Sequence, residues 1–169
     1  MRIYTWTTLA SSYKDTGEYK KAIDVYNKIL RIDPNNYSAL SNLGVLYIKI
    51  DSYRNAIHIL EHALEIKSKN NQFSELQQIF PFFKTPYVFK PKLSTEDLWY
   101  YLGFAYSEIG ELNKAIEAYN RTLKINSNQK YAWNRSGYIY NKLGEHDKAI
   151  EACMRAIEID PKFANPWNH

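Results

Sequence analysis

Residues 130–163, KYAWNRSGYIYNKLGEHDKAIEACMRAIEIDPKF, carry a pattern that occurs four times in a chain of 169 residues. The pattern repeats every 34 positions, with one interruption of 25 residues between its second and third occurrence. Its anchors are Trp133, Gly137, Tyr140, Gly144, Ala149, Ala156 and Pro161, and the equivalent positions hold Trp99, Gly103, Tyr106, Gly110 and Ala115, then Leu40, Gly44, Tyr47 and Ala56, then Trp6, Ala10, Tyr13, Ala22 and Pro34. A fixed period with fixed anchors predicts stacked repeats.

Each repeat is predicted to form two helices joined by a short turn. In the first repeat, apolar residues recur at helical spacing on both sides of the turn sequence Asp15-Thr16-Gly17-Glu18. Gly17 can adopt a positive φ at a helix end, and Pro34 cannot continue the second helix. Helices of about a dozen residues are marginal alone in water, so we expect stability to come from stacking.

Small residues recur where two helices are expected to cross closely. The first helices carry Ala10, Gly44, Gly103 and Gly137, and the second helices carry Ala22, Ala56, Ala115 and Ala149. Large aromatic and aliphatic anchors would fill the space around each crossing. We therefore interpret these anchors as packing residues.

The pattern resembles the tetratricopeptide repeat, a 34-residue helix-turn-helix unit. The resemblance rests on residues such as Trp99, Leu102, Gly103 and Tyr106 in one repeat, with Leu40, Ser68 and Ser127 as local departures. It implies an all-α fold, an α-solenoid in which the repeats form a right-handed superhelix. The predicted domain comprises repeats at 3–36, 37–70, 96–129 and 130–163, an insertion at 71–95, and the start of a fifth repeat or a cap at 164–169.

The insertion at 71–95 does not align with the repeat. Phe73, Leu76 and Phe80 share a helical face, which favours a short helix ending before Pro81, although the second helix of repeat two lacks its proline stop and could run on. The proline-punctuated aromatic stretch that follows could pack on its neighbouring repeats, act as a partner-binding arm, or be disordered. Ser94 and Asp97 have the spacing of a helix N-cap with its reciprocal partner.

Composition excludes several classes of function. The net charge of +4 comes from 22 basic and 18 acidic residues mixed within each repeat, which argues against a nucleic-acid surface. No apolar run approaches the length of a membrane helix, so no membrane insertion is expected. The single cysteine, Cys153, suits a reducing compartment, and we expect a cytoplasmic location.

We find no pattern that predicts catalysis, a cofactor or a metal site. The sequence His58-Ile59-Leu60-Glu61-His62 matches an inverted zinc-protease motif, but both histidines are predicted on the outer side of their helix and no third ligand is evident. Cys153 occupies a packing position without a nucleophilic constellation, so an inert core thiol is favoured. No glycine-rich phosphate loop is present.

The resemblance implies that the first helix of each repeat lines a concave groove that binds peptides or partner helices. Transferred by repeat position, the candidate partner-binding residues are Tyr4, Thr8, Asn42, Tyr100, Tyr101, Phe104, Tyr131, Asn134, Arg135 and Tyr138. Tyrosine and arginine are typical of binding hot spots, although ordinary exposed aromatics would give the same pattern. The lysine-asparagine-arginine clamp of the family's chaperone-tail binders is not matched, because Thr7, Ser11, Asp97 and Tyr101 fill four of its places.

The sequence therefore favours a non-catalytic protein-interaction module that binds an extended peptide or a partner helix. Two alternatives remain. Trp167 stands 34 positions after Trp133, which indicates the start of a fifth repeat that the sequence does not complete. The last full helix is therefore expected to expose apolar surface. Copies of the chain could associate through such ends, or through the insertion, to form a homo-oligomer. The chain could also be a fragment of a larger enzyme or regulator with its catalytic domain elsewhere.

Overall fold

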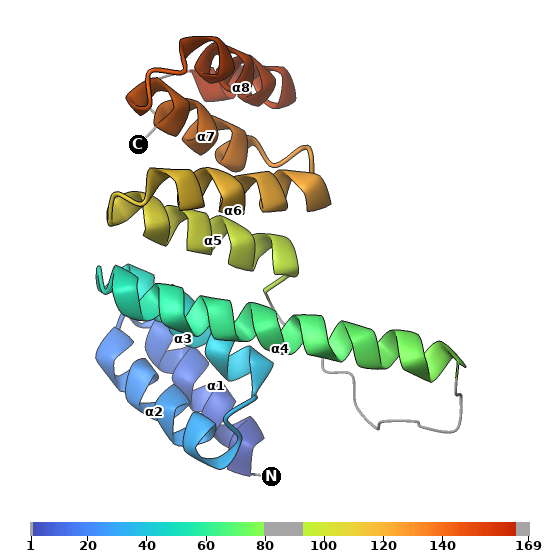
Figure 1. Cartoon of the computed structure of the whole chain (residues 1–169). Helices are drawn as coiled ribbons and strands as arrows, with labels where there is room; N and C mark the ends of the chain where they lie inside the picture. The colour runs from blue at the N-terminus through green and yellow to red at the C-terminus, as the bar shows by residue number, and fades with distance from the viewer. Residues whose placement is uncertain (1, 80–92, 165–169) are drawn as a thin grey trace. The chain divides into compact units, whose positions relative to one another are not determined.

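A computed structural model describes the backbone at residues 2–79 and 93–164, and side chains at 3–69 and 93–162. The helices within these ranges are α1 (Arg2–Asp15), α2 (Tyr19–Ile32), α3 (Tyr37–Lys49), α4 (Tyr53–Ile79), α5 (Thr95–Glu108), α6 (Leu112–Ile125), α7 (Lys130–Lys142), α8 (His146–Ile159) and the short 3-10 helix η1 (Pro161–Ala164) (Figure 1). The described residues contain no strand. The predicted all-α fold is confirmed.

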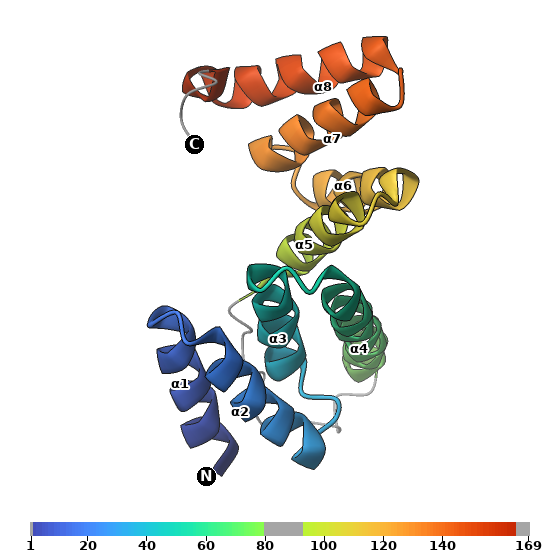
Figure 2. The same cartoon turned by 90° about the vertical axis from the view of Figure 1, so that its left-hand side faces the viewer.

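The chain divides into two compact units, Met1–Leu98 and Trp99–His169. In the first unit, α2 packs against α1 and α3, and α3 packs against α4, as Figure 2 also shows. In the second unit, α7 packs against both α6 and α8. Within each unit, a helix therefore contacts its hairpin partner and the hairpin next to it, which is the nearest-neighbour stacking of a repeat protein.

Each helical hairpin turns through one residue with a positive φ. Gly17, Gly110 and Gly144 adopt φ values of 78°, 82° and 77°, so the predicted conformation of Gly17 is confirmed. In the second repeat Asp51 takes this place with a φ of 56°. A residue with a Cβ is strained in this region, although aspartate tolerates it better than most. The Tyr53 hydroxyl donates a hydrogen bond to Asp51 Oδ1 at 2.7 Å.

Close helix crossings occur at the predicted glycines. A Cβ added at Gly44 would lie 2.5 Å from Leu60 Cδ2, and one added at Gly103 would lie 2.9 Å from the Tyr119 ring. At Gly137 the nearest atom would be Cys153 Sγ at 2.6 Å. In all three hairpins, the first helix thus lacks a side chain where the second helix places its own.

The insertion begins as a continuation of α4 and not as a separate helix. Because repeat two has Ser68 where the repeat pattern has a proline, α4 runs without a break from Tyr53 to Ile79. The proline-punctuated stretch that follows falls outside the described residues. Repeat three then begins with the predicted cap, in which Asp97 N donates to Ser94 Oγ at 3.1 Å and Ser94 N donates to Asp97 Oδ2 at 2.8 Å.

Candidate functional site

In the second unit, α5 and α7 bring a cation and aromatic rings together. Tyr100 and Phe104 are four residues apart on α5, and Tyr131 and Arg135 are four residues apart on α7, so each pair occupies one helix face. The Arg135 guanidinium carbon lies 5.1 Å from the centre of the Phe104 ring. This is the geometry of a cation–π contact. Arg135 of α7 therefore contacts Phe104 of α5 and adjoins Tyr100, and Tyr131 is close enough to Tyr100 to act on its pKa.

Tyr100 connects this place to the core. Its ring centre lies 5.7 Å from the rings of Tyr101 and Tyr119, tilted to both. Burial raises the pKa of the Tyr100 hydroxyl above its ordinary value, while the charge of Arg135 and a hydrogen bond with it act in the opposite direction. The Tyr100 hydroxyl is therefore a neutral donor beside a cation at physiological pH.

Tyr119, on α6, stands at the packing position that Cys153 occupies in repeat four. Its side chain is fully buried, and its hydroxyl makes no hydrogen bond of good geometry within the described residues, although the Ser107 side chain is close enough to act on its pKa as a hydrogen-bond partner. Burial raises its pKa far above the ordinary range, and Arg135 again acts in the opposite direction. The same repeat position holds Tyr26, Leu60 and Cys153, and the Tyr26 hydroxyl is buried in the same way, so a tyrosine here is also explained by packing.

Other candidates on α7 are exposed. Tyr131 and Tyr138 are 49% and 52% exposed, and Asn134 is also exposed. Lys130 lies 5.2 Å from the centre of the Tyr131 ring, and Lys142 lies 4.6 Å from that of Tyr138. The second unit therefore contains a partly buried arginine and tyrosine, and α7 carries two exposed aromatic rings.

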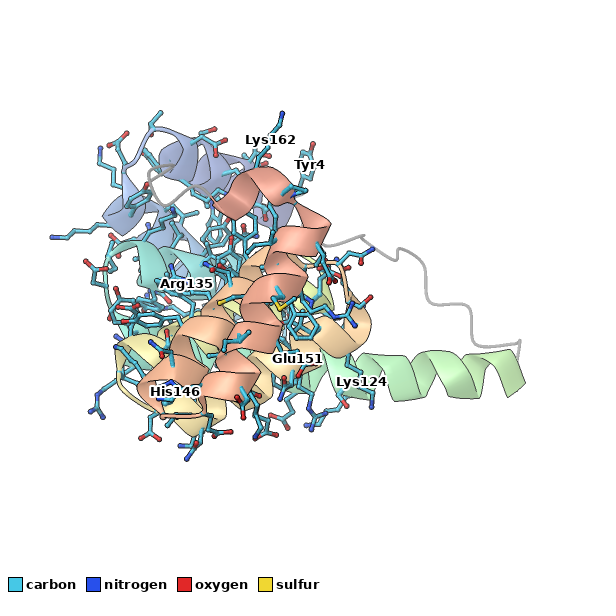
Figure 3. All side chains as sticks on the ribbon, turned by 90° about the horizontal axis from the view of Figure 1, so that it is seen from above. Tyr4, Lys124, Arg135, His146, Glu151 and Lys162 are labelled. Carbon is cyan, nitrogen blue, oxygen red and sulfur yellow. The ribbon has the colours of Figure 1, made fainter. Side chains whose placement is uncertain are left out.

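Arg135 differs from the other arginines of this unit in its charge partners. Arg121 pairs with Glu117 at 3.7 Å, and Arg155 pairs with Glu158 at 3.0 Å. Within the described parts of the chain, no carboxylate lies within 4.0 Å of the Arg135 guanidinium. Figure 3 shows Arg135 on the opposite side of α8 from Lys124 and Glu151.

The candidates of the first unit have a different environment. Asn42 is 7% exposed, its amide nitrogen donates to Ser38 O at 2.8 Å, and its amide oxygen accepts from Lys14 Nζ at 3.3 Å. The Thr8 hydroxyl donates to Tyr4 O at 3.2 Å. Tyr4 is exposed. The polar groups that were expected to face a partner are here engaged within the unit, and Asn42 lies beneath the surface.

The described residues hold no cluster of three or more His, Cys, Asp or Glu side chains that could bind a metal ion. His58 is exposed and His62 partly so. Cys153 is a free thiol whose Sγ lies against Gly137. None of the described helices combines the length and the apolar character that crossing a membrane requires.

Comparison with known proteins identifies the repeats. Sequence profiles described as "Tetratricopeptide repeat" match residues 96–129, 131–163 and 37–70, and one described as "TPR repeat" matches residues 10–51. Together they cover more than half of the chain. The chain belongs to the tetratricopeptide-repeat family. The resemblance inferred from the anchor residues is thereby confirmed, and so is the solenoid class of the fold.

This tetratricopeptide-repeat chain is similar to segments of longer proteins. It is 25% identical over 133 residues to the general transcriptional corepressor trfA of Dictyostelium discoideum, a match that covers 72% of this chain and 10% of the relative. It is 29% identical over 117 residues to the BBSome complex member BBS4 of Bos taurus, covering 63% of this chain and 22% of the relative. The chain therefore spans less than a quarter of either relative.

Solved structures of MamA share the fold. One crystal structure superimposes with a TM-score of 0.77 at 28% identity, covering 95% of this chain and 74% of MamA. Another has a TM-score of 0.73 at 29% identity, covering 91% of this chain and 75% of MamA. Both agree with the tetratricopeptide-repeat assignment.

Proposed function

We propose that the chain is a non-catalytic interaction module that binds an extended peptide or a helix of another protein. The observation that carries this proposal is the cluster of Tyr100, Phe104 and Arg135, together with the exposed rings of Tyr131 and Tyr138 on α7. None of these five side chains is an anchor of the repeat. Aromatic residues and arginine dominate the energetics of protein interfaces. The family match supports the same class of function.

Partner capture with matched variants tests this proposal. The wild-type chain, the double variant Tyr101→Ala/Arg135→Ala and the control Lys124→Ala would each be used to capture proteins from a lysate of the source organism. Proteins that distinguish the samples would then be purified and titrated against each variant. We expect Lys124→Ala to retain binding and the double variant to lose it, with helicity by circular dichroism unchanged in both. Equal affinity of the wild type and the double variant for every captured protein would refute the proposed surface.

Self-association is a second candidate, favoured by an apolar stripe on α8. Ile150, Met154 and Ile157 are 60%, 56% and 43% exposed. At the repeat position of Ile150, Ile23 and Ile57 are only 8% and 9% exposed. In the first two repeats this position is therefore covered, whereas α8 leaves it open. A second copy that covered the stripe would remove this apolar area from water.

Light scattering over a concentration series tests self-association. We expect the mass of the wild type to rise toward that of a dimer, and Met154→Glu to remain at the monomer mass. A strict monomer at millimolar concentration would exclude this candidate without affecting the peptide-binding proposal.

The cytoplasmic location and the absence of catalysis, cofactor and nucleic-acid partner also remain proposals. They rest on the single cysteine, on the mixed charge and on the lack of any catalytic constellation in the sequence.

A further inference from the structure

The exposed face of α7 carries two tyrosines with an asparagine between them. Tyr131, Asn134 and Tyr138 recur at helical spacing, so their side chains project from one side of the helix. The two tyrosines are 49% and 52% exposed, and Asn134 is also exposed. The step from the first tyrosine to the second is two turns of helix, about 10.5 Å along the axis. This face therefore presents two aromatic rings at that spacing with an amide between them.

The repeat does not require this pair of tyrosines. None of the other first helices carries tyrosine at both positions: they hold Tyr4, Ser38 and Asp97 at the position of Tyr131, and Ser11, Val45 and Phe104 at that of Tyr138. Packing within the unit does not account for the pair either, because about half of each tyrosine remains exposed. A pair of large exposed aromatic rings is typical of a surface that binds a partner.

The same helix is positively charged and rich in hydrogen-bond donors. It contains Lys130, Arg135 and Lys142 and no acidic residue. Lys142 Nζ lies 4.6 Å from the centre of the Tyr138 ring, and neither Lys142 nor Arg135 forms an ion pair within the described residues. Lysine and arginine side chains donate hydrogen bonds and accept none. A ligand whose exposed polar groups are acceptors complements such a surface.

Three conformations of a bound segment place different demands on this face. The backbone carbonyls of a partner α-helix are bonded within that helix, so Asn134 would find no free backbone acceptor between the rings. The side chains on one face of a β-strand recur about every 6.7 Å, which does not match rings about 10.5 Å apart. In a polyproline II helix every third residue recurs after about 9.3 Å, and the backbone carbonyls are free. Only the last conformation satisfies both the rings and the amide.

We propose that Tyr131, Asn134 and Tyr138 bind a proline-rich segment of another protein in the polyproline II conformation. The proposal rests on the proposed peptide-binding function and specifies its ligand. Two prolines three residues apart pack on the two tyrosine rings, and the Asn134 amide nitrogen donates to a backbone carbonyl between them. Proline lacks a backbone N–H, so such a segment presents carbonyl acceptors to the donors of α7. Its conformation is preformed in the free peptide, which lowers the entropy cost of binding.

A peptide selection tests this class of ligand. A library of random 12-residue peptides, displayed on a carrier protein, would be selected on the wild type and on the double variant Tyr131→Ala/Tyr138→Ala. We expect pairs of prolines three residues apart among the peptides selected on the wild type, and no such preference on the double variant. Peptides selected on the wild type without a proline preference would overturn this ligand and leave the peptide-binding function intact. If the wild type selects no peptide at all, both proposals fail.

Titrations with a selected peptide test the match in spacing. Synthetic versions with the two prolines two, three or four residues apart would be titrated against the wild type and against Lys124→Ala as a control. We expect the three-residue spacing to bind about tenfold or more tightly than the other two, because only that spacing places a proline on each ring. The control variant should give the same order and the same affinities. Equal affinity at all three spacings would overturn the pairing of two prolines with two tyrosines.

Asn134→Asp separates the hydrogen bond from the aromatic contacts. The substitution keeps the size of the side chain and replaces the amide donor with a carboxylate that repels a carbonyl oxygen. We expect about a tenfold or greater loss of affinity for the selected peptide, and about a threefold loss for Asn134→Ala, which only removes the donor. Because Asn134 is exposed, circular dichroism and thermal unfolding should not differ between the variants and the wild type. Unchanged affinity of Asn134→Asp would exclude Asn134 from the site.

Discussion

Repeats two and four place different residues at equivalent positions, and the differences show which parts of a repeat are free to serve binding. Asn42 and Arg135 occupy the same position of α3 and α7, respectively. The amide of Asn42 is hydrogen-bonded to Ser38 O and to Lys14 Nζ. The Arg135 guanidinium lies over the Phe104 ring and has no ion pair in the described residues. At one of these positions the side chain is hydrogen-bonded within its unit, whereas at the other a cation has no ion pair within the described residues.

The largest expected effect concerns this pair. We predict that Arg135→Ala weakens binding of a captured partner by about 30-fold, the size of an interface hot spot, with little loss of stability. Asn42→Ala should change that affinity by less than about twofold, because its amide is already engaged, but should lower stability by about 1 kcal/mol through the lost hydrogen bonds. Calorimetric titration and urea unfolding measure the two quantities. Similar affinity losses in both variants would show that Asn42 and Arg135 do not differ in their contribution to binding.

The close crossings of the same two repeats are expected to differ in tolerance. At Gly44 an added methyl group would meet Leu60 Cγ at 2.7 Å and Cδ2 at 2.5 Å, and Leu60 is fully buried. We predict that Gly44→Ala lowers stability by about 1–2 kcal/mol, since overpacking exceeds the gain in helix propensity.

Gly137→Ala is the matched variant. Here the nearest atom is Cys153 Sγ at 2.6 Å, and this partly exposed side chain can rotate away, which leaves the backbone oxygen of Ala149 at 3.2 Å as the remaining close contact. The expected loss is below about 1 kcal/mol, because the propensity gain offsets the remaining crowding. Urea unfolding of both variants checks the order, and a greater loss for Gly137→Ala would contradict this account of the crossing.

The hairpin turns give a smaller expected effect. Asp51 has a φ of 56° where repeat four has Gly144 at 77°. We predict that Asp51→Gly raises stability by about 0.5 kcal/mol, because relief of strain exceeds the added entropy of the unfolded chain. The reciprocal change, Gly144→Asp, should lower stability by about 1 kcal/mol. Thermal unfolding of the two variants would reveal any reversal of sign.

The smallest expected effect lies where each repeat closes. Lys130 forms an ion pair with Asp160 at 2.5 Å, whereas the equivalent pair in repeat two is Lys67 over the Tyr37 ring at 5.7 Å. The hydrogen bond from Lys130 is the main cause that lowers the pKa of Asp160 below its ordinary value of 3.8. The pair therefore stabilises the fold above that pH and loses its effect as pH falls through the lower folded-state pKa.

Asp160→Asn should consequently be slightly less stable than the wild type at pH 7 and equal to it once Asp160 is protonated in the folded state. Unfolding curves at pH 7 and near pH 2.5 measure this difference, and Lys67→Met in repeat two, which removes the ring contact, should show no such pH dependence. A constant difference between Asp160→Asn and the wild type at both pH values would argue against a role of the ion pair.

The helical hairpins, the turn at Gly17 and the close crossings could be predicted from residue types, as could the cap formed by Ser94 and Asp97. These features depend on local geometry: a positive φ at Gly17, a missing side chain at Gly137, or the Ser94 hydroxyl three residues before the backbone N–H of Asp97. The turn at Asp51 could not be predicted, because aspartate does not by itself indicate a positive φ. The continuity of α4 was less certain, because the absence of a proline at Ser68 permits a helix to continue without requiring it.

The binding candidates show the limit of this reasoning. Repeat position placed Asn42 and Arg135 in one row, since helical periodicity specifies the direction of a side chain relative to its own axis. Periodicity does not specify which groups of other helices meet that side chain. Lys14 of α1 reaches Asn42, and the Tyr119 ring of α6 lies at a tilt 5.7 Å from the Tyr100 ring, because folding brings residues together that are distant in the sequence. Amino-acid order alone therefore defines the repeat and its packing, whereas the contacts between helices define which polar groups remain free to bind a partner.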